Sequence, residues 1–351
     1  MSRPPETPSI SNDADAIIHP TPFPKVVLIG CGRITEFAHA PVLRDGAGPR
    51  VVGLVDDDPE RADGIARLLG GPGRIATYRR IGDAPFDAAT MAVVATPTPL
   101  HADTAAEALA AAPCVLVEKP LAATGAAARR LLDLARRTRR HLLCVHNRRH
   151  EPALRRLLEV CASGTVGRPR TVTYLHHTTA PFPGAWAAEP MWRSGTEGGC
   201  LADLGYHGVY LAREILAAPV AGAEAVETVW RGPVLERAAV RTTHIGGAGA
   251  AIDVAWTASS DAFRVVVDCS AGRVTADDTG RLSVATAAGG EVRERHPAGF
   301  GPAYRALYAD AARRTAGPPR YDQAATAVET ADVLDTLAAA CRARRPEEAA
   351  T

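Results

Sequence analysis

The chain has 351 residues, of which 46% are hydrophobic and 23% charged, and its 40 Lys and Arg offset 39 Asp and Glu. A chain of this length exceeds what one hydrophobic core usually supports, so we expect two domains. The net charge of +1 excludes the large field of one sign that nucleic-acid and anionic-membrane binders carry. Seven scattered cysteines without a C-x-x-C pair favour reduced thiols in a cytoplasmic protein over a disulfide framework or a metal site.

The two ends of the chain differ in composition from its middle. Residues 1–23 are rich in proline and polar side chains and lack the apolar centre of a signal peptide, so we expect a disordered leader. Residues 346–351 should form a frayed tail. Between these ends the hydrophobic periodicity changes, and we predict one domain over 24–148 and a second over 149–345.

Short apolar runs alternate with helical stretches in the first predicted domain. The run from Lys25 to Gly30 is apolar and ends in glycine, as a buried parallel strand does. Later strands are expected at 51–55, 91–95, 113–117 and 142–145, with helices at 34–44, from 59, at 100–111 and at 123–139. This alternation with short connections predicts an α/β fold with a doubly wound parallel sheet of the Rossmann type.

A glycine turn and an aspartate indicate a dinucleotide site. Gly30 allows a tight turn after the first strand, and Gly32 lets the backbone approach a pyrophosphate at the amino end of the next helix. Thr35 stands where the third glycine of the fingerprint is expected. Asp56 ends the second strand, 24 residues after Gly32, at the usual position of the acid that binds a ribose 2′-hydroxyl. The alternative is a purely steric glycine turn and a solvated acidic turn.

The cofactor preference follows from the same strand end. Two further aspartates follow Asp56, and no arginine comes directly after the strand to meet a 2′-phosphate. Three carboxylates would repel the extra phosphate of NADP, so the sequence predicts NAD in preference to NADP.

Glu118-Lys119-Pro120 follows the apolar run 113–117 and is a candidate reaction centre. A lysine at the end of a buried strand is costly unless a cation is needed there, and ligands bind at the carboxyl ends of strands in open α/β sheets. The alternative is a structural Glu118–Lys119 ion pair closed by a proline that stops the strand.

The second predicted domain changes to alternating periodicity. We expect strands at 171–175, 225–229, 238–243, 251–256 and 263–267, glycine-containing hairpin turns between them, and closing helices at 302–314 and 322–342. This pattern predicts an α+β domain with a large open, mainly antiparallel sheet. Such a sheet would leave one face wet, so we expect a homodimer or homotetramer.

Asp203 and His207 are four residues apart, so on a helix they share a face and can touch. A carboxylate beside a histidine orients the ring and raises its basicity. The alternative is an ordinary pair on a helix surface.

The loop 181–197 before this pair should determine substrate choice, because specificity commonly lies in loops. Trp186, Trp192 and Arg193 are candidate substrate contacts within it. Trp186, Trp192 and Tyr206 could supply flat apolar faces for a sugar ring or could be core aromatics.

These motifs, in this order, resemble the Gfo/Idh/MocA family, which comprises glucose–fructose oxidoreductase, inositol dehydrogenase and rhizopine-catabolism proteins. The likeness runs from about residue 25 to 340 and is carried by Gly30-x-Gly32, Ala95-Thr96-Pro97 with His101, Glu118-Lys119-Pro120, and Gly198-Gly199-x-x-x-Asp203-x-Gly205-x-His207. The resemblance implies a Rossmann domain and an open-sheet domain that serves in oligomers. It also implies NAD(P)-dependent oxidation or reduction at a secondary carbon of a sugar, aminosugar or cyclitol.

The resemblance further implies roles for individual residues. Lys119 would lie near the reacting hydroxyl, Asp203 would orient substrate, and His207 would be the acid–base residue. Glu118 would line the nicotinamide ribose, and Arg148 would reach into the substrate site. The other expected cofactor contacts are Gly30, Gly32, Arg33, Ile34, Asp56, Thr96, Pro97 and His101.

We therefore expect a dehydrogenase or ketoreductase in which Lys119 and His207 handle the proton. His207 would be the base, held by Asp203, and Lys119 would stabilise the developing alkoxide or take the proton itself. The alternatives are an NAD-dependent glycoside hydrolase of the same fold and a non-catalytic sugar-sensing regulator. The presence of Lys119, Asp203 and His207 together argues against the regulator.

Overall fold

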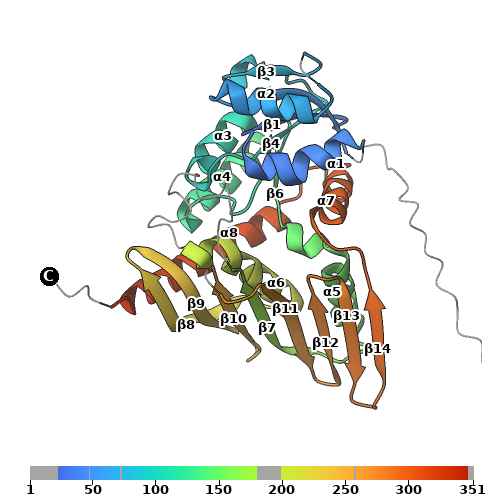
Figure 1. The fold of residues 1–351 in the computed structure, drawn as a ribbon, viewed down its shortest axis with the longest axis vertical. Helices are drawn as coiled ribbons and strands as arrows, with labels where there is room; N and C mark the ends of the chain where they lie inside the picture. Colours follow the sequence, from blue (N-terminus) through green and yellow to red (C-terminus); the bar gives the residue numbers. More distant parts are fainter. Residues whose placement is uncertain (1–22, 47, 72, 180–198, 257, 347–351) are drawn as a thin grey trace, which may run out of the picture.

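The computed structural model describes residues 23–346 except 47, 72, 180–198 and 257. It contains a six-stranded parallel sheet and an eight-stranded, mainly antiparallel sheet, one above the other in Figure 1. Both predicted sheets are therefore confirmed. None of the helices in the described ranges is long and apolar enough to cross a membrane.

The first sheet has the strand order β3-β2-β1-β4-β5-β6, with every pair parallel. Its strands are β1 (Lys25–Ile29), β2 (Arg50–Val55), β3 (Ala76–Tyr78), β4 (Thr90–Val94), β5 (Cys114–Val117) and β6 (His141–Cys144). Strand β3 was not predicted, because its three residues are exposed or half-buried and form no apolar run.

Helices cover both faces of this sheet, which explains why its central strands are continuously apolar. Val26 and Leu28 of β1 belong to one core cluster, and Val27 and Ile29 belong to another on the opposite face. The connecting helices are α1 (Ala40–Arg44), entered through a π-helical turn at Thr35–His39, α2 (Pro59–Leu68), α3 (His101–Ala111) and α4 (Gly125–Thr138).

The second sheet has the order β14-β13-β12-β11-β7-β10-β9-β8. Its strands are β7 (Pro169–His177), β8 (Val220–Arg231), β9 (Val234–His244), β10 (Gly249–Ala255), β11 (Ala262–Cys269), β12 (Gly272–Asp277), β13 (Arg281–Thr286) and β14 (Glu291–Arg295). The pairing of β7 with β10 is parallel, and the other pairs are antiparallel. The last three strands were not predicted, because they are short and rich in charged and small residues.

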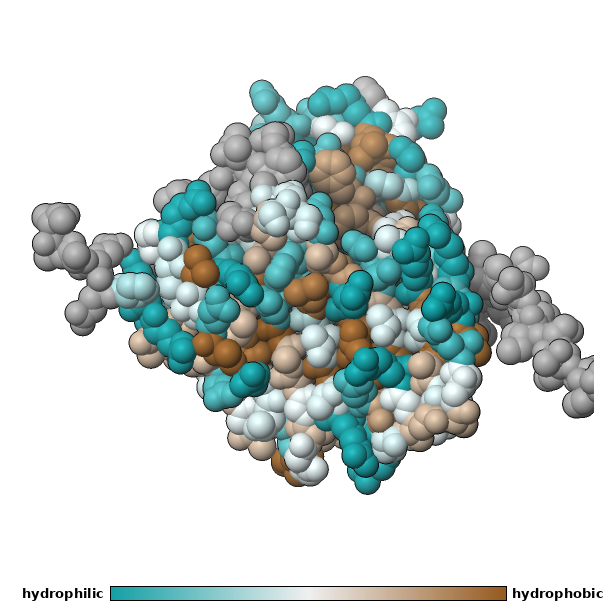
Figure 2. Space-filling model, turned by 60° about the horizontal axis from the view of Figure 1, so that its bottom comes forward, coloured by the Kyte–Doolittle hydropathy of each residue, from teal (hydrophilic) through white to brown (hydrophobic). Residues whose placement is uncertain are grey.

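One face of the second sheet carries α5 (Pro152–Ser163) and α6 (Tyr206–Leu216), which follows a π-helical turn at Leu201–Gly205. Helix α5 was also missed, although Pro152 at its first turn and the buried positions 153, 154, 157, 160 and 161 are an amphipathic helix signal. The opposite face exposes the alternate residues, among them Thr173 of β7 and Ala251 of β10. With the lower end of this domain brought forward, hydrophobic residues lie interspersed with hydrophilic ones (Figure 2).

The two closing helices return to the first domain. Helix α7 (Phe300–Arg314) buries Tyr304, Leu307 and Tyr308 in the same core as β1, beside α1 in Figure 1. Helix α8 (Asp322–Ala343) packs its first half on the parallel sheet and its second half on the open-sheet core. The C-terminal segment therefore places side chains at the junction of the two domains.

Candidate active site

A cleft of about 1030 Å³ lies at the carboxyl ends of β1, β2 and β4. Gly30 forms its floor with a φ of +94°, and a Cβ there would lie 2.7 Å from the backbone of Ala95 and Thr96, so only glycine fits. A Cβ on Gly32 would meet nothing within 4 Å, which leaves the turn open to the cleft. Thr35, which replaces the third fingerprint glycine, closes the turn by donating a hydrogen bond of 2.6 Å to the Gly30 carbonyl.

Asp56 lines this cleft at the end of β2 and holds the glycine turn. Its Oδ2 accepts a 2.6 Å hydrogen bond from the Cys31 N–H, and its Oδ1 accepts one of 2.9 Å from the Asp58 N–H. Burial, reinforced by the neighbouring Asp57, raises the pKa of the Asp56 carboxyl. Asp58 caps α2, as the sequence Asp-Pro suggests.

Two arginines that follow β3 also line this end of the cleft. Arg79 donates a 3.1 Å hydrogen bond to the Asp57 carbonyl, and Arg80 adjoins it. These arginines were not predicted, because β3 was not predicted and Arg79 lies 22 residues from Asp57.

The inner end of the cleft contains a buried polar group that fits a ligand. Among the described residues nothing bonds the hydroxyl of Thr96, although its Oγ1 is buried. Pro97, Arg33 and Ile34 line the same cleft, and the Arg33 guanidinium stacks 4.3 Å from the ring of Phe37. The glycine turn, the strand-end carboxylate and this unpaired hydroxyl fit the pyrophosphate, ribose and nicotinamide portions of a dinucleotide.

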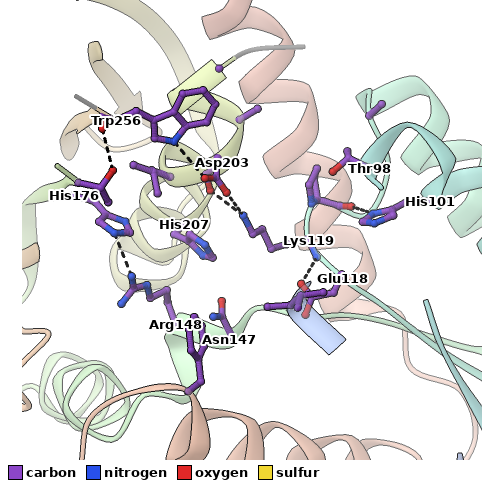
Figure 3. A pocket seen from close by; sticks show the side chains of 18 of the residues that line it. Thr98, His101, Glu118, Lys119, Asn147, Arg148, His176, Asp203, His207 and Trp256 are labelled. Carbon is purple, nitrogen blue, oxygen red and sulfur yellow. Dashed lines mark hydrogen bonds and ion pairs between the residues drawn. The ribbon is translucent and has the colours of Figure 1, made fainter. Parts of the chain in front are cut away.

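A second cavity of about 380 Å³ shares Ile34 and Thr96 with the cleft. It lies between the two domains, and Lys119, Asp203, His207 and Arg148 point into it from both sides (Figure 3). The structure thus brings together predicted residues that are up to 88 positions apart in the sequence. The predicted contacts Trp186, Trp192 and Arg193 lie outside the described residues.

Lys119 and Asp203 form an ion pair within this cavity. Lys119 Nζ donates to Asp203 Oδ1 at 2.7 Å and to the Asp203 carbonyl at 3.0 Å. Asp203 Oδ2 accepts a 3.3 Å hydrogen bond from the indole N–H of Trp256. These described bonds lead from Asp203 to Lys119 and Trp256, whereas the sequence predicted that Asp203 would hold the His207 ring. Asp203 lies in the π-helical turn Leu201–Gly205, and His207 lies in the helix α6 that follows.

Glu118 is bound by residues other than the Lys119 ammonium. Its Oε1 accepts hydrogen bonds from His39 Nε2 at 3.2 Å and from the Tyr304 hydroxyl at 2.7 Å, and its Oε2 accepts one of 3.1 Å from the Lys119 backbone N–H. Burial alone would raise the pKa of Glu118, but the bonds from His39 and Tyr304 together with the charge of Lys119 hold it below its usual value. The expected side-chain pair of Glu118 and Lys119 is replaced by a backbone contact that fixes the strand end.

His207 is buried and neutral. Burial, followed by the charges of Lys119 and Arg148, holds its pKa well below the ordinary 6.5. Its Nδ1 lies 3.3 Å from the hydroxyl of Tyr210, a residue whose own pKa burial raises well above 10. In the tautomer in which Nδ1 carries the ring proton and donates it to the Tyr210 oxygen, Nε2 has a free lone pair that can accept a proton.

Arg148 is fixed on the opposite wall of the cavity. Its guanidinium donates to Glu151 Oε1 at 2.8 Å, contacts His176 Nε2 at 3.3 Å and lies 4.3 Å above the ring of Phe263. Burial, and then the charge of Arg148, lowers the pKa of His176 to about 3, so this ring is neutral.

Several cavity residues were not predicted, namely Asn147, His176, Trp256 and Tyr304. Asn147 directly precedes Arg148, and nothing in the described chain bonds its buried Oδ1. The other three lie in β7, directly after β10 and in α7, elements that reach the cavity only through the packing of the second domain. The predicted His101 bonds the Pro120 and Thr96 carbonyls at 2.6 and 2.8 Å and so joins the ends of two strands.

Comparison with known proteins matches both halves of the chain. Residues 24–146 match the oxidoreductase family with an NAD-binding Rossmann fold, and residues 154–275 match the GFO/IDH/MocA C-terminal domain. The chain belongs to the Gfo/Idh/MocA family. The resemblance that the motifs indicated is confirmed.

The relatives of this family member act on sugars and cyclitols by name. The chain is 31% identical over 201 residues to the dTDP-3,4-didehydro-2,6-dideoxy-alpha-D-glucose 3-reductase of Saccharopolyspora spinosa, covering 56% of this chain and 57% of that protein. It is 30% identical over 190 residues to inositol 2-dehydrogenase of Rhizobium meliloti, covering 54% of each. The matched part thus spans about half the length of these curated relatives.

Solved structures agree over nearly the whole chain. Levoglucosan dehydrogenase in complex with NADH and levoglucosan superposes with a TM-score of 0.78 at 19% identity, over 92% of this chain and 98% of the other. GenD2 from gentamicin A biosynthesis, in complex with NAD, gives 0.74 at 24% identity over 92% and 95%. At these identities the agreement shows the shared fold.

Proposed function

We propose that this protein transfers hydride between NAD and a secondary alcohol or ketone carbon of a sugar, aminosugar or cyclitol. The observation that carries the proposal is one cavity in which the Lys119 ammonium and the neutral His207 ring face the inner end of the nucleotide cleft. Carboxylate, guanidinium, amide and imidazole groups around the cavity suit a ligand with several hydroxyl groups.

The chain's own residues would handle the proton. Bound NAD supplies the hydride acceptor. His207 Nε2 takes the proton of the reacting hydroxyl, and the Lys119 ammonium stabilises the negative charge that develops on that oxygen. In the reductive direction His207 returns the proton to the same oxygen. Tyr210 keeps the ring in the accepting tautomer, and Asp203 holds the ammonium in place.

The composition of the chain supports a chemical role for Lys119. Lys25 and Lys119 are the only lysines among its 40 Lys and Arg residues. An ion pair with Asp203 alone could be made by arginine, which forms bidentate carboxylate bonds more readily. A compact ammonium with a transferable proton is what lysine adds.

We propose NAD as the preferred cofactor, because Asp56 ends β2 inside the cleft with two aspartates behind it. Arg61, Arg79 and Arg80 carry opposing charges in the lining of the same cleft. The Arg79 guanidinium donates one hydrogen bond to the Asp57 carbonyl.

We propose a homodimer or homotetramer joined through the open face of the second sheet, supported by the exposure of Thr173 and Ala251 on the face opposite α5 and α6. On this face Asp253 pairs with Arg237 and lies 3.1 Å from His177 Nε2, so the Arg237 and Asp253 charges are already paired before a second copy binds. We also propose a cytoplasmic location, since all seven cysteines are free thiols.

The test compares His207→Ala and Lys119→Ala with the unaltered enzyme on cyclic polyols and sugars such as myo-inositol, levoglucosan and D-xylose. We expect both variants to bind NAD normally and to lose roughly a hundredfold or more in turnover. Lys25→Ala, the other lysine, is the matched control and should remain active. Near-normal turnover of both site variants would reject this active site. Release of sugar from glycosides without NADH accumulation would assign the hydrolase reaction instead.

A further inference from the structure

Trp256 lies directly after β10 and forms part of the cavity wall. It is 2% exposed, and its backbone N–H donates a 2.8 Å hydrogen bond to the Glu236 carbonyl on β9. Its indole N–H points at Asp203 from the side opposite Lys119 (Figure 3). The ring is therefore held by a strand of the second sheet and directed at the ion pair.

The two oxygens of the Asp203 carboxylate are divided between two donors. Oδ1 accepts from the Lys119 ammonium at 2.7 Å, and Oδ2 accepts from Trp256 Nε1 at 3.3 Å. A hydrogen bond to a charged carboxylate is stronger than one between neutral groups, and it is directional. With Trp256 in place, the carboxylate cannot turn about its terminal bond without losing this donor.

We propose that Trp256 is a positioning residue for the reaction, one that fixes the Lys119 ammonium over the reacting oxygen by holding the Asp203 carboxylate. The expected effect of Trp256 on turnover rests on the proposed function. The contact itself concerns only protein atoms, so it can be measured without a substrate.

Another tryptophan supplies a matched control. Trp230 on β8 also has a buried indole nitrogen, and the described residues offer it no hydrogen-bond acceptor. Changing either tryptophan to phenylalanine keeps an aromatic ring and removes the N–H. Only the Trp256 change removes a bond to the ion pair.

The first experiment needs no turnover. Because the chain has two lysines, ¹⁵N labelling of lysine side chains yields two ammonium signals, which Lys25→Arg and Lys119→Arg assign. We expect Trp256→Phe to shift or broaden the Lys119 signal and leave that of Lys25, which pairs with Asp87, in place. Trp230→Phe should move neither. A Lys119 signal unchanged by Trp256→Phe would overturn the proposal.

A reciprocal measurement remains if Trp256→Phe does not fold. With ¹⁵N-labelled indoles, Asp203→Asn should move the Trp256 N–H signal upfield and leave that of Trp230. An unmoved Trp256 signal would also overturn the proposal.

The second experiment is a double-mutant cycle on whichever polyol gives turnover. We expect Trp256→Phe to lower kcat about tenfold with NAD affinity unchanged, and to cost little further in an Asp203→Asn background. Fully additive losses would contradict a role exerted through Asp203. If no polyol is turned over, the proposed function fails, and the lysine signals still decide whether Trp256 holds Lys119.

Discussion

Lys119 Nζ lies 2.7 Å from Asp203 Oδ1, across 84 residues of sequence and across the junction of the two domains. Lys119 lies two residues after β5 of the parallel sheet, and Asp203 lies in a π-helical turn of the second domain. The ion pair therefore couples the relative placement of the domains to the position of the ammonium. His207, which shares the segment with Asp203, is instead held by Tyr210.

Lys119→Arg should retain the positive charge and lose about a hundredfold or more in turnover. The planar guanidinium is longer than the ammonium and cannot present the same point charge to the reacting oxygen. Steady-state kinetics with NAD binding measured separately would check this. Lys25→Arg, made alongside it, should leave turnover near normal, and activity of Lys119→Arg close to that of the parent would show that charge alone suffices.

Tyr210→Phe should lower turnover by about tenfold without weakening NAD binding. Loss of the hydroxyl 3.3 Å from His207 Nδ1 lets the ring change tautomer and orientation. The measurement is kcat beside the NAD dissociation constant. Tyr321→Phe removes a hydroxyl that bonds a carbonyl on α4 and serves as the control. Equal kcat values for Tyr210→Phe and the unaltered enzyme would remove the tyrosine from the mechanism.

Asp56→Ser should narrow or reverse the preference for NAD over NADP. The carboxylate at the end of β2 favours a free ribose hydroxyl and repels a 2′-phosphate, and Arg79 and Arg80 are nearby to receive that phosphate once the carboxylate is gone. Dissociation constants for both cofactors give the ratio directly. Arg79→Ala in the Asp56→Ser background should restore discrimination against NADP. Comparable binding of NADP by the unaltered protein would contradict the preference.

The stability of the fold should decrease as the pH falls below 6.5, partly because of His150. Burial lowers the pKa of this histidine from 6.5 to about 3, so between these values the unfolded chain binds a proton that the folded chain does not. The contribution of His150 to stability is therefore complete above pH 6.5 and is lost progressively as the pH falls toward 3. Urea unfolding should show a pH slope smaller in His150→Gln by at most about 1.4 kcal/mol per pH unit. Above pH 7.5 the free energies of unfolding of the unaltered protein and His150→Gln should differ by a constant amount. Identical pH slopes for the two proteins below pH 6.5 would show that His150 does not contribute to the pH dependence of stability.

Light scattering should give a native mass of two or four times 36.8 kDa. Ala251→Arg places a charge at the centre of the open sheet face and should produce monomers, because an unpaired charge in an interface is costly to desolvate. Asp57→Arg, on the first domain and far in sequence from that face, should leave the mass unchanged. A monomer for the unaltered protein at micromolar concentration would reject assembly through this face.

The sequence alone determined the fold class, the glycine turn after β1 and several residues that line the cavity. Buried parallel strands read as apolar runs, and the turn after β1 needs a glycine with φ of +94° because the backbone of Ala95 and Thr96 lies against it. Lys119 was identifiable because a cation at a buried strand end requires a reason. Each of these constraints acts on a few neighbouring residues, so a short sequence pattern is enough to predict it.

Only the tertiary structure decided which groups meet. The four-residue spacing of Asp203 and His207 suggested a pair, but the described hydrogen bonds of Asp203 lead to Lys119 and Trp256. Tyr304 reaches Glu118 from 186 residues away, since α7 returns to the parallel sheet. Such contacts arise from the packing of whole domains, whose cores form from many weak apolar contacts that no single motif encodes.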